Sequence, residues 1–349
     1  MSTVIASVPR GSRPRVGFLG LGWIGRHRMR ALLASESVEV AAIADVCREN
    51  AAAAGAMVPG ALQVATLDQL LELDLDGVVI ATPSACHAAQ AIRALDRGLA
   101  VFCQKPLAIS AAETAQVVSA ARRANRSLSV DFSYRFTDGM RKIHDLVRSG
   151  ELGEIFAADL FFHNAYGPDK AWFYDPELSG GGCLMDLGSH LVDLALWLFD
   201  FPEVCNVSSA LFAKGVQLHR APGAVEDFAV VSYRLASGQL VRVACSWNLP
   251  AGRDAVIEAS VYGTAGGACF KNVEGSFYDF AAERFHGTAR EALAAPPDDW
   301  GGRAAVAWAE QLTRGGGFDP AADRLVDVAQ ALETAYQQSR ECARPGKAA

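Results

Sequence analysis

One glycine-rich stretch near the start of the chain constrains the fold more than any other feature. An apolar strand over residues 16–19 enters three glycines spaced G-x-G-x-x-G (Gly20, Gly22 and Gly25), and a helix follows. This pattern is typical of a turn that holds the pyrophosphate of a dinucleotide. Gly20 permits the tight turn, Gly22 leaves room for the phosphates, and Gly25 lets the helix pack on its strand. The free N–H groups at the helix start attract the anion.

The same glycine spacing occurs in ordinary turns, but its surroundings favour a nucleotide site. A second apolar strand, residues 40–44, ends in Asp45, 25 residues after Gly20. A carboxylate there can accept both hydroxyls of an adenosine ribose and repels a 2′-phosphate, which predicts NAD as the cofactor. A helix cap is the plain alternative for Asp45. Trp23 and Ile24, inside the turn, are expected beside the cofactor.

Composition excludes several classes of protein. The 349 residues suggest two domains, and a net charge of −7 without a long basic run argues against nucleic-acid binding. The eight cysteines form no C-x-x-C pair, so we expect buried thiols rather than disulfides or a metal site. We expect residues 1–14 to be a disordered tail rather than a signal peptide. No run approaches ~18 apolar residues, which predicts no membrane span and, by default, a cytoplasmic protein.

Strands and helices alternate from residue 15 to about residue 132, which predicts a parallel, doubly wound sheet. The strands are expected at residues 16–19, 40–44, 77–81, 100–103 and 127–132, with helices between them. Ligands of such sheets bind at the carboxyl ends of the strands. The predicted site therefore includes the residues found at those ends, namely Gly20, Asp45, Thr82, Gln104 and Tyr134.

A connecting helix is expected at residues 140–148, and after residue 150 the pattern changes to long strands that follow one another. They are expected at residues 155–162, 204–212, 227–235, 239–247, 256–262 and 268–273, with a hairpin turn at 236–238 and one helix at 185–199. This pattern predicts an α+β domain with a large, mostly antiparallel open sheet. Residues 280–302 are expected to be a loop, and 304–312 and 321–339 closing helices. We therefore predict a nucleotide-binding domain over 15–135 and a substrate-binding and oligomerisation domain over 136–342.

Three further stretches carry groups suited to chemistry. Thr82-Pro83 follows a strand and leads to His87, which could simply cap a helix. Gln104-Lys105-Pro106 follows another strand, and the lysine would point to the ligand cleft. The third stretch is a G-G-G-x-x-x-D-x-G-x-H run that begins at Gly180. Its Asp186 and His190 are four residues apart and share one helix face. The glycines before them would admit a ligand close to the backbone, and a flexible loop with a surface Asp–His pair is the alternative.

Together these stretches resemble the glucose-fructose oxidoreductase / inositol dehydrogenase / rhizopine catabolism (Gfo/Idh/MocA) family. The resemblance spans residues 15 to about 335. It implies a substrate site lined by Lys105, Asp186 and His190, with Arg135 and Trp172 in segments near the nicotinamide. The implied activity is hydride transfer between NAD and a secondary alcohol or ketone of a sugar, polyol or sugar-like ring. His190 would be the general base or acid, Lys105 would polarise the oxygen, and Asp186 would orient the substrate or Lys105.

The chain departs from the family at one position, because the glutamate of the E-K-P motif is Gln104 here. Two alternatives to a dehydrogenase stay open. Some members of the family hydrolyse glycosides through a bound NAD, and others are non-catalytic sugar or nucleotide sensors that would have lost the Lys105, Asp186 and His190 set. The resemblance also implies a homodimer or homotetramer. The substrate and the physiological direction do not follow from the sequence.

Overall fold

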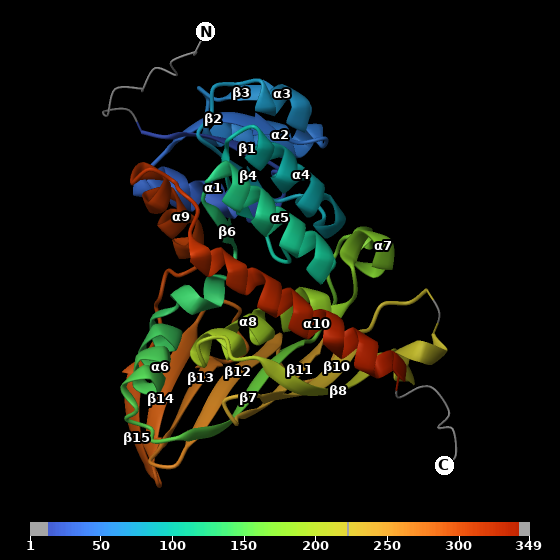
Figure 1. Ribbon diagram of the computed structural model, residues 1–349, viewed down its shortest axis with the longest axis vertical. Coiled ribbons are helices and arrows are strands. Elements are labelled where there is room, and N and C mark those ends of the chain that lie inside the picture. Colours follow the sequence, from blue (N-terminus) through green and yellow to red (C-terminus); the bar gives the residue numbers. More distant parts are fainter. Residues whose placement is uncertain (1–12, 222, 342–349) are drawn as a thin grey trace.

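The computed structural model describes residues 13–221 and 223–341, which form two stacked sheets with helices between and around them (Figure 1). Most of the predicted tail at residues 1–14 lies outside the described residues. The first sheet is entirely parallel, with the order β3-β2-β1-β4-β5-β6. Its strands are β1 (Arg15–Leu19), β2 (Glu39–Ala44), β3 (Leu62–Val64), β4 (Gly77–Ile80), β5 (Ala100–Cys103) and β6 (Leu128–Val130). The helices that connect them are α1 (Trp23–Ser35), α2 (Arg48–Met57), α3 (Leu67–Leu71), α4 (Ser84–Asp96) and α5 (Ala111–Ala124). The predicted doubly wound sheet is confirmed.

The central strands of this sheet are short apolar runs because helices cover both of their faces. Every residue of β4 and of β5 is buried, as expected for a parallel sheet inside an α/β layer. The strand order reverses between β1 and β4. Ligands of doubly wound sheets bind at such a reversal, beyond the carboxyl ends of the strands.

The second sheet has nine strands in the order β15-β14-β13-β12-β7-β11-β10-β8-β9. Every neighbouring pair of its strands is antiparallel except β7 with β11. Helices α6 (Asp138–Ser149), α8 (Ser189–Leu198) and α10 (Arg324–Glu341) cover one face (Figure 1). The strands are β7 (Ile155–Asn164), β8 (Val204–Ala213), β9 (Val216–Gln217), β10 (Phe228–Leu235), β11 (Leu240–Ser246), β12 (Ala255–Gly263), β13 (Gly267–Asn272), β14 (Phe280–His286) and β15 (Ala289–Ala294).

The loop predicted over residues 280–302 is wrong in its first half, which forms the hairpin β14–β15. His286 pairs with Ala289, and Gly287 takes a positive φ of 57° at the start of the two-residue turn. The segment has few β-branched residues and carries charges, so its local pattern is weak. Backbone pairing of β14 with the edge of β13 decides its conformation.

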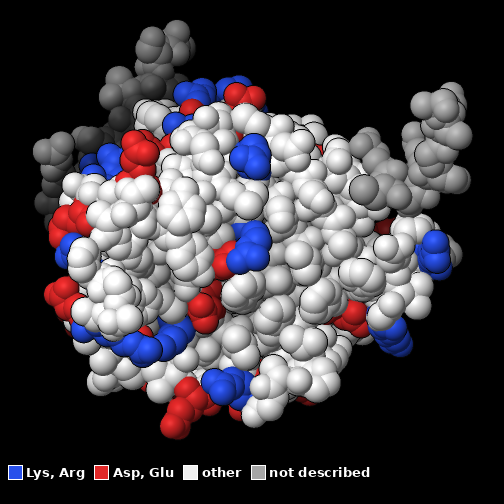
Figure 2. Space-filling view, turned by 90° about the horizontal axis from the view of Figure 1, so that it is seen from below, with Lys and Arg blue, Asp and Glu red and all other residues white. Residues whose placement is uncertain are grey.

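Among the described residues, no helix covers the opposite face of the large sheet (Figure 1). The view from below shows a surface with few charges near its centre (Figure 2). Val230, Leu240 and Tyr262 are 39%, 36% and 40% exposed there. Near them Arg242 pairs with Asp159, which also accepts a hydrogen bond from the hydroxyl of Tyr262. We refer to these residues as the open face.

The division predicted at residue 135 does not separate two independent cores. Helix α9 (Arg303–Thr313) returns from the second half of the chain and packs on α1 and β5. Its Trp308 is buried with its ring centroid 5.9 Å from that of Phe102. Helix α10 then contacts both α5 and β8, running along the junction of the two layers (Figure 1). The range 136–342 thus contributes a helix to the core of the first sheet.

No helix in the described part of the chain is long and apolar enough to cross a membrane. Four of its seven cysteines are buried as predicted, but Cys205 is exposed. Cys183 and Cys245 lie side by side as free thiols, with their sulfurs 3.9 Å apart.

Candidate active site

A cavity of about 1090 Å³ opens at the carboxyl ends of the first sheet and is closed on its other side by the second sheet. All five strand-end residues singled out in the sequence line it: Gly20, Asp45, Thr82, Gln104 and Tyr134. The parallel sheet brings these distant positions to one edge. The second sheet and α8 contribute the opposite wall, including Asn164, Trp172, Asp186, His190 and Trp247.

The glycine turn has the shape that a dinucleotide pyrophosphate needs. A Cβ on Gly22 would meet no atom within 4 Å, whereas one on Gly20 would lie 2.4 Å from the carbonyl oxygen of Ala81. Gly25 packs beneath the turn, where a Cβ would lie 2.3 Å from the oxygen of Gly20. No side chain caps the start of α1, so its first N–H groups can bind an anion. Trp23 and Ile24 line the cavity beside the turn.

Asp45 faces the same cavity and is held by backbone amides. Its Oδ2 accepts a hydrogen bond from the N–H of Leu21 at 2.6 Å, and its Oδ1 accepts one from Cys47 at 2.7 Å. These contacts fix the carboxylate next to the glycine turn. A ribose with free 2′- and 3′-hydroxyls is the ligand that such a carboxylate suits.

His87 lines the cavity, but its ring nitrogens are engaged within the protein. Nδ1 lies 2.7 Å from the carbonyl oxygen of Pro106, and Nε2 lies 2.7 Å from that of Thr82. Burial lowers the pKa of His87, while the contacts of its ring with these two carbonyl oxygens oppose that shift. His87 therefore ties the segment Thr82-Pro83 to the segment that carries Lys105, and it neither caps its helix nor offers a nitrogen to a cofactor.

Lys105 and Asp186 form an ion pair within the cavity. Nζ of Lys105 lies 2.6 Å from Oδ1 of Asp186 and donates to the backbone oxygen of the same residue at 2.9 Å. Oδ2 of Asp186 accepts a hydrogen bond from Nε1 of Trp247 at 3.2 Å. Both charged side chains are largely buried, being 17% and 15% exposed. The carboxylate of Asp186 thus holds the ammonium of Lys105 at the carboxyl end of β5.

His190 lies on the same wall, one turn beyond Asp186. The π-helical turn η3 (Leu184–Gly188) carries Asp186 and leads directly into α8, which carries His190. Burial lowers the pKa of His190 well below 6.5, and the cations Lys105 and Arg28 lower it further. Its Nδ1 has no hydrogen-bond partner among the described residues, and Tyr134 packs edge-on against the ring. His190 is therefore a neutral base at neutral pH.

The side chain of Gln104 is committed to a buried ion pair. Its Nε2 donates to Oδ2 of Asp131 at 2.5 Å, and Nε of Arg28 donates to the same oxygen at 2.5 Å. All three side chains line the cavity, and Asp131 is 1% exposed. A carboxylate is therefore present beside position 104, although the family glutamate is absent.

The expectation for Arg135 is not supported, because its guanidinium lies away from the cavity. It forms an ion pair with Asp193 of α8, donating to Oδ2 from Nε at 2.6 Å. The rings of Phe132, Trp197 and Phe201 surround it within 6 Å. The sequence motif placed Arg135 next to the cavity but could not show where its long side chain points. Trp172, by contrast, lines the cavity, stacked on Phe173 at 3.8 Å between centroids.

The three glycines before η3 serve the packing of the protein itself. A Cβ on Gly180, Gly181 or Gly182 would collide with Ile109, the hydroxyl of Tyr336 or the backbone oxygen of Glu226. The expected approach of a ligand to all three is thus wrong, although Gly181 borders the cavity. Oε1 of Glu226 accepts from the N–H groups of Gly182 and Leu184 and from the hydroxyl of Tyr336.

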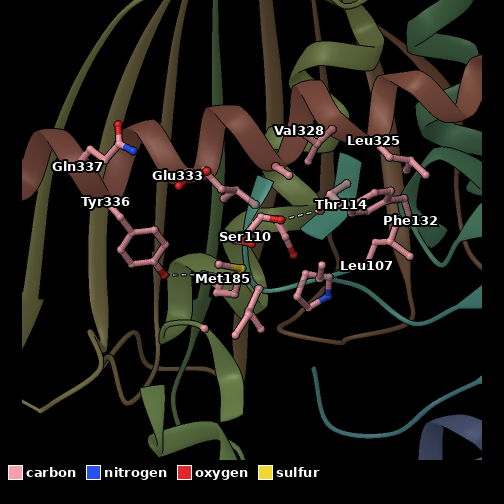
Figure 3. Close-up of a pocket in the computed structure, with 17 residues that line it drawn as sticks. Leu107, Ser110, Thr114, Phe132, Met185, Leu325, Val328, Glu333, Tyr336 and Gln337 are labelled. Atoms are coloured by element: carbon pink, nitrogen blue, oxygen red, sulfur yellow. Dashed lines mark hydrogen bonds between the residues drawn. The ribbon is translucent and has the colours of Figure 1, made fainter. Parts of the chain in front are cut away.

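A second, smaller cavity of about 190 Å³ lies behind this segment, between α10 and the residues that follow Lys105 (Figure 3). Met185 and Ser189, the neighbours of Asp186 and His190, border it. The hydroxyl of Tyr336, on α10, accepts a hydrogen bond from the N–H of Met185 at 3.1 Å. Through Glu226 and Tyr336, α10 therefore holds the turn that presents Asp186.

The residues that line the cavity and that sequence reasoning missed include Arg28, Asp131 and Asn164. Oδ1 of Asp131 and Oδ1 of Asn164 are buried without a partner, like Nδ1 of His190. Buried polar atoms are normally paired, so these three atoms, from the end of β6, from β7 and from α8, are available to a polar ligand or to water. Asn164 ends β7, and its place at a strand end was the one signal in the sequence.

A parallel sheet has a phosphate-binding turn and a lysine at the ends of its strands, and a second layer faces it with an aspartate and a histidine. This arrangement defines the class of two-layer nucleotide-dependent oxidoreductases. Residues 14–132 match a family model described as "Oxidoreductase family, NAD-binding Rossmann fold", and residues 140–269 match the "GFO/IDH/MocA C-terminal domain". The chain belongs to the Gfo/Idh/MocA family.

Several of the relatives are named as dehydrogenases or oxidoreductases. The chain is 31% identical over 248 residues to an inositol 2-dehydrogenase of Leifsonia xyli subsp. xyli, covering 70% of each chain. It is 31% identical over 189 residues to the rhizopine catabolism protein MocA of Rhizobium meliloti, where the match spans 57% of that protein's length and 54% of this chain. These names give no support to a glycoside hydrolase.

Solved structures share the fold over almost the whole chain. GenD2 from gentamicin A biosynthesis, in complex with NAD, superposes with a TM-score of 0.80 at 24% identity and 98% coverage of both chains. Levoglucosan dehydrogenase, in complex with NADH and L-sorbose, does so with a TM-score of 0.80 at 22% identity, covering 95% of this chain and 97% of that one.

Proposed function

We propose that the protein is an NAD-dependent dehydrogenase or reductase that acts on a secondary alcohol or ketone of a sugar, polyol or sugar-like ring. The observation that carries this proposal is the convergence of Lys105, Asp186 and His190 on the cavity that also contains the glycine turn. A non-catalytic sensor has no need of this set. The named dehydrogenases among its relatives support the same reaction class.

The residues that would hold the cofactor are those around the turn. The N–H groups at the start of α1 would bind the pyrophosphate, and Asp45 would bind the adenosine ribose. Gln104 and the Arg28–Asp131 pair would lie toward its nicotinamide end. When bound, the nicotinamide ring supplies or accepts the hydride.

The remaining chemistry falls to the side chains of this chain. His190, neutral because it is buried, takes the proton of the substrate hydroxyl during oxidation and returns it during reduction. The ammonium of Lys105 stabilises the negative charge that develops on the substrate oxygen. Asp186 holds that ammonium in position, and Trp247 fixes the second oxygen of Asp186.

We also propose that two copies associate through the open face. Val230, Leu240 and Tyr262 expose apolar surface on the face of the sheet that no helix in the described part of the chain covers. Exposed apolar patches of this kind mark association sites. A homodimer, or a homotetramer built from such dimers, would cover them.

The test of the catalytic proposal is an assay of NADH formation with a panel of polyols, hexoses, aminosugars and glycosides. NAD-dependent oxidation of at least one ring, lost in Lys105→Ala and in His190→Ala, is the expected result. Release of an aglycone without net NADH formation would instead identify a hydrolase.

A further inference from the structure

The charged residues of the cavity indicate which kind of ring it accepts. Within the described residues, each lysine or arginine that lines it lies against an aspartate: Arg28 against Asp131, Lys105 against Asp186, and Lys170 against Asp169. The nitrogen–oxygen distances are 2.5, 2.6 and 3.6 Å. Arg28 and Lys105 are held in largely buried pairs, and the exposed Lys170 also lies beside a carboxylate, so the charge of each of the three cations is already partly balanced.

The cavity also has an excess of negative charge. Asp45 adds a fourth carboxylate to the three paired ones, so the aspartates outnumber the lysines and arginines that line it. A phosphoryl group on a substrate would bring further negative charge. Sites that recognise phosphate place an unpaired arginine or lysine, or the N-terminus of a helix, against it. The uncapped start of α1 lies in the half that we assign to the cofactor.

The half formed by the second sheet is aromatic instead. Trp172 stacks on Phe173, whose ring lies edge-on to Trp247 with centroids 6.3 Å apart. Tyr166 and Tyr278 line the same half and are 51% and 53% exposed. Large aromatic side chains left exposed around a cleft offer apolar faces to a ligand. A sugar or cyclitol ring presents such a complementary surface on its C–H face.

We propose that the site is specific for an uncharged sugar or cyclitol ring whose C–H face packs on this aromatic wall, and that it discriminates against sugar phosphates and nucleotide sugars. This proposal rests on the proposed function, because it concerns the substrate of the same site. The phosphate-bearing substrates are disfavoured by the closed set of ion pairs, and the uncharged ring is favoured by the aromatic surface.

The experiment compares matched ligands by binding as well as by turnover. The protein saturated with NAD is titrated with glucose and glucose 6-phosphate, and with myo-inositol and an inositol monophosphate. The signal is fluorescence, since Trp172, Trp247 and Trp300 line the cavity. We expect the uncharged member of a pair to bind at least about 10-fold more tightly. Tighter binding of the phosphorylated member, or no binding of any uncharged ring, would overturn the proposal.

Turnover separates this proposal from the one on which it rests. Uncharged rings that bind without forming NADH would contradict the proposed dehydrogenase activity but would support the proposed preference for uncharged ligands. NADH formed only from phosphorylated members would uphold the dehydrogenase and overturn the ligand class.

A charge reversal tests the ion-pair argument directly. Asp169→Lys converts the exposed Asp169–Lys170 pair into two cations, and Asp169 is 87% exposed, so folding should not suffer. At low ionic strength we expect this variant to bind the phosphorylated ligand about 10-fold more tightly than the parent does. Asp145→Lys on α6, where the carboxylate is 82% exposed and outside the cavity, is the matched control. An equal gain in affinity in both variants, or no gain in Asp169→Lys, would show that the ion pairs of the cavity do not keep phosphorylated ligands out.

Discussion

Nε2 of Gln104 and Nε of Arg28 both donate to one oxygen of Asp131, each at 2.5 Å. The neutral amide and the guanidinium together hold a carboxylate that is 1% exposed. This relationship explains why a glutamine can stand where the family has a glutamate. The negative charge belongs to Asp131 here, and a second one beside it would have no additional cation to balance it.

Gln104→Glu should therefore destabilise the fold in a pH-dependent way. Two carboxylates in contact raise the pKa of one of them above its unfolded value. A carboxyl group with a raised folded pKa costs stability as the pH rises from its unfolded pKa through its folded pKa. We expect the variant to lose about 1–3 kcal/mol relative to the parent between pH 4 and 8, measured by denaturant unfolding. Gln104→Met, which loses the hydrogen bond to Asp131 but adds no carboxylate, should show a weaker pH dependence than Gln104→Glu. An identical pH dependence in both variants would refute this reading of the pair.

His190 should set an acid limb in the pH profile of oxidation. Only the neutral ring can take a proton, and burial together with Lys105 and Arg28 lowers its pKa. The limb of kcat/KM should therefore lie below pH 6.5, with activity falling as the pH decreases through it. Lys105→Met, although slow, should move the limb upward because a neighbouring cation is gone. His190→Asn should lower kcat by about 10²-fold. A limb that persists unchanged in His190→Asn would assign the base to another group.

The Lys105–Asp186 pair should matter for the rate more than for binding. Asp186→Asn keeps a side-chain acceptor for Trp247 and the backbone oxygen that Lys105 also contacts, but it removes the charge. We expect kcat to fall by about 10- to 100-fold with a smaller change in KM. Trp247→Phe, which removes the hydrogen bond and keeps the charge, is the control and should lose less. A larger loss of kcat in Trp247→Phe than in Asp186→Asn would mean that the orientation of Asp186 matters more for the rate than its charge does.

Asp45 should determine the choice of cofactor. Asp45→Asn preserves an acceptor for the N–H of Leu21 and removes the charge that repels a 2′-phosphate. The ratio of kcat/KM for NAD to that for NADP should fall by about 10-fold. Glu49→Gln, at the nearby start of α2 and outside the cavity, should leave the ratio unchanged. A parent protein that already prefers NADP would contradict the proposed role.

Val230→Asp should dissociate the oligomer. The substitution places a charge on the apolar open face, where an interface would have to bury it. Light scattering should show a shift toward monomer at concentrations where the parent is a dimer or larger. Leu62→Asp on β3 is the control, since Leu62 is 53% exposed on the other sheet. A monomeric parent, or an unchanged mass in Val230→Asp, would show that the open face is not an interface between copies of the chain.

Sequence patterns predicted that the residues at the strand ends lie together, because the carboxyl ends of parallel strands all lie at the same edge of the sheet. Gly20, Asp45 and Thr82 need no knowledge of the second sheet to be brought together. The same logic placed Lys105 at the cleft, and the family motifs added Asp186 as a residue that orients either the substrate or Lys105. Each of these predictions depends on backbone topology, which local periodicity encodes well.

Contacts between distant side chains could not be predicted in this way. Nothing around Arg28 or Asp131 indicates that they meet across 103 residues. The direction of Arg135 depends on Asp193, which a different element supplies. The β14–β15 hairpin depends on the exposed edge of β13. In each case the partner decides the conformation, and the local sequence carries little of that information.

The return of α9 to the first sheet bears on how this protein could be divided or recombined. Trp308 fills the space against Gly77, where a Cβ would lie 2.9 Å from its ring, and Ala304, Ala305 and Ala309 are buried beside it. A fragment that stops after residue 135 would leave that hollow open to water and would be prone to aggregate. A chimaera that exchanges substrate specificity by grafting a foreign second half would need to retain α9 from the original chain. The break points suited to such grafting therefore number two, one before α6 and one between β15 and α9.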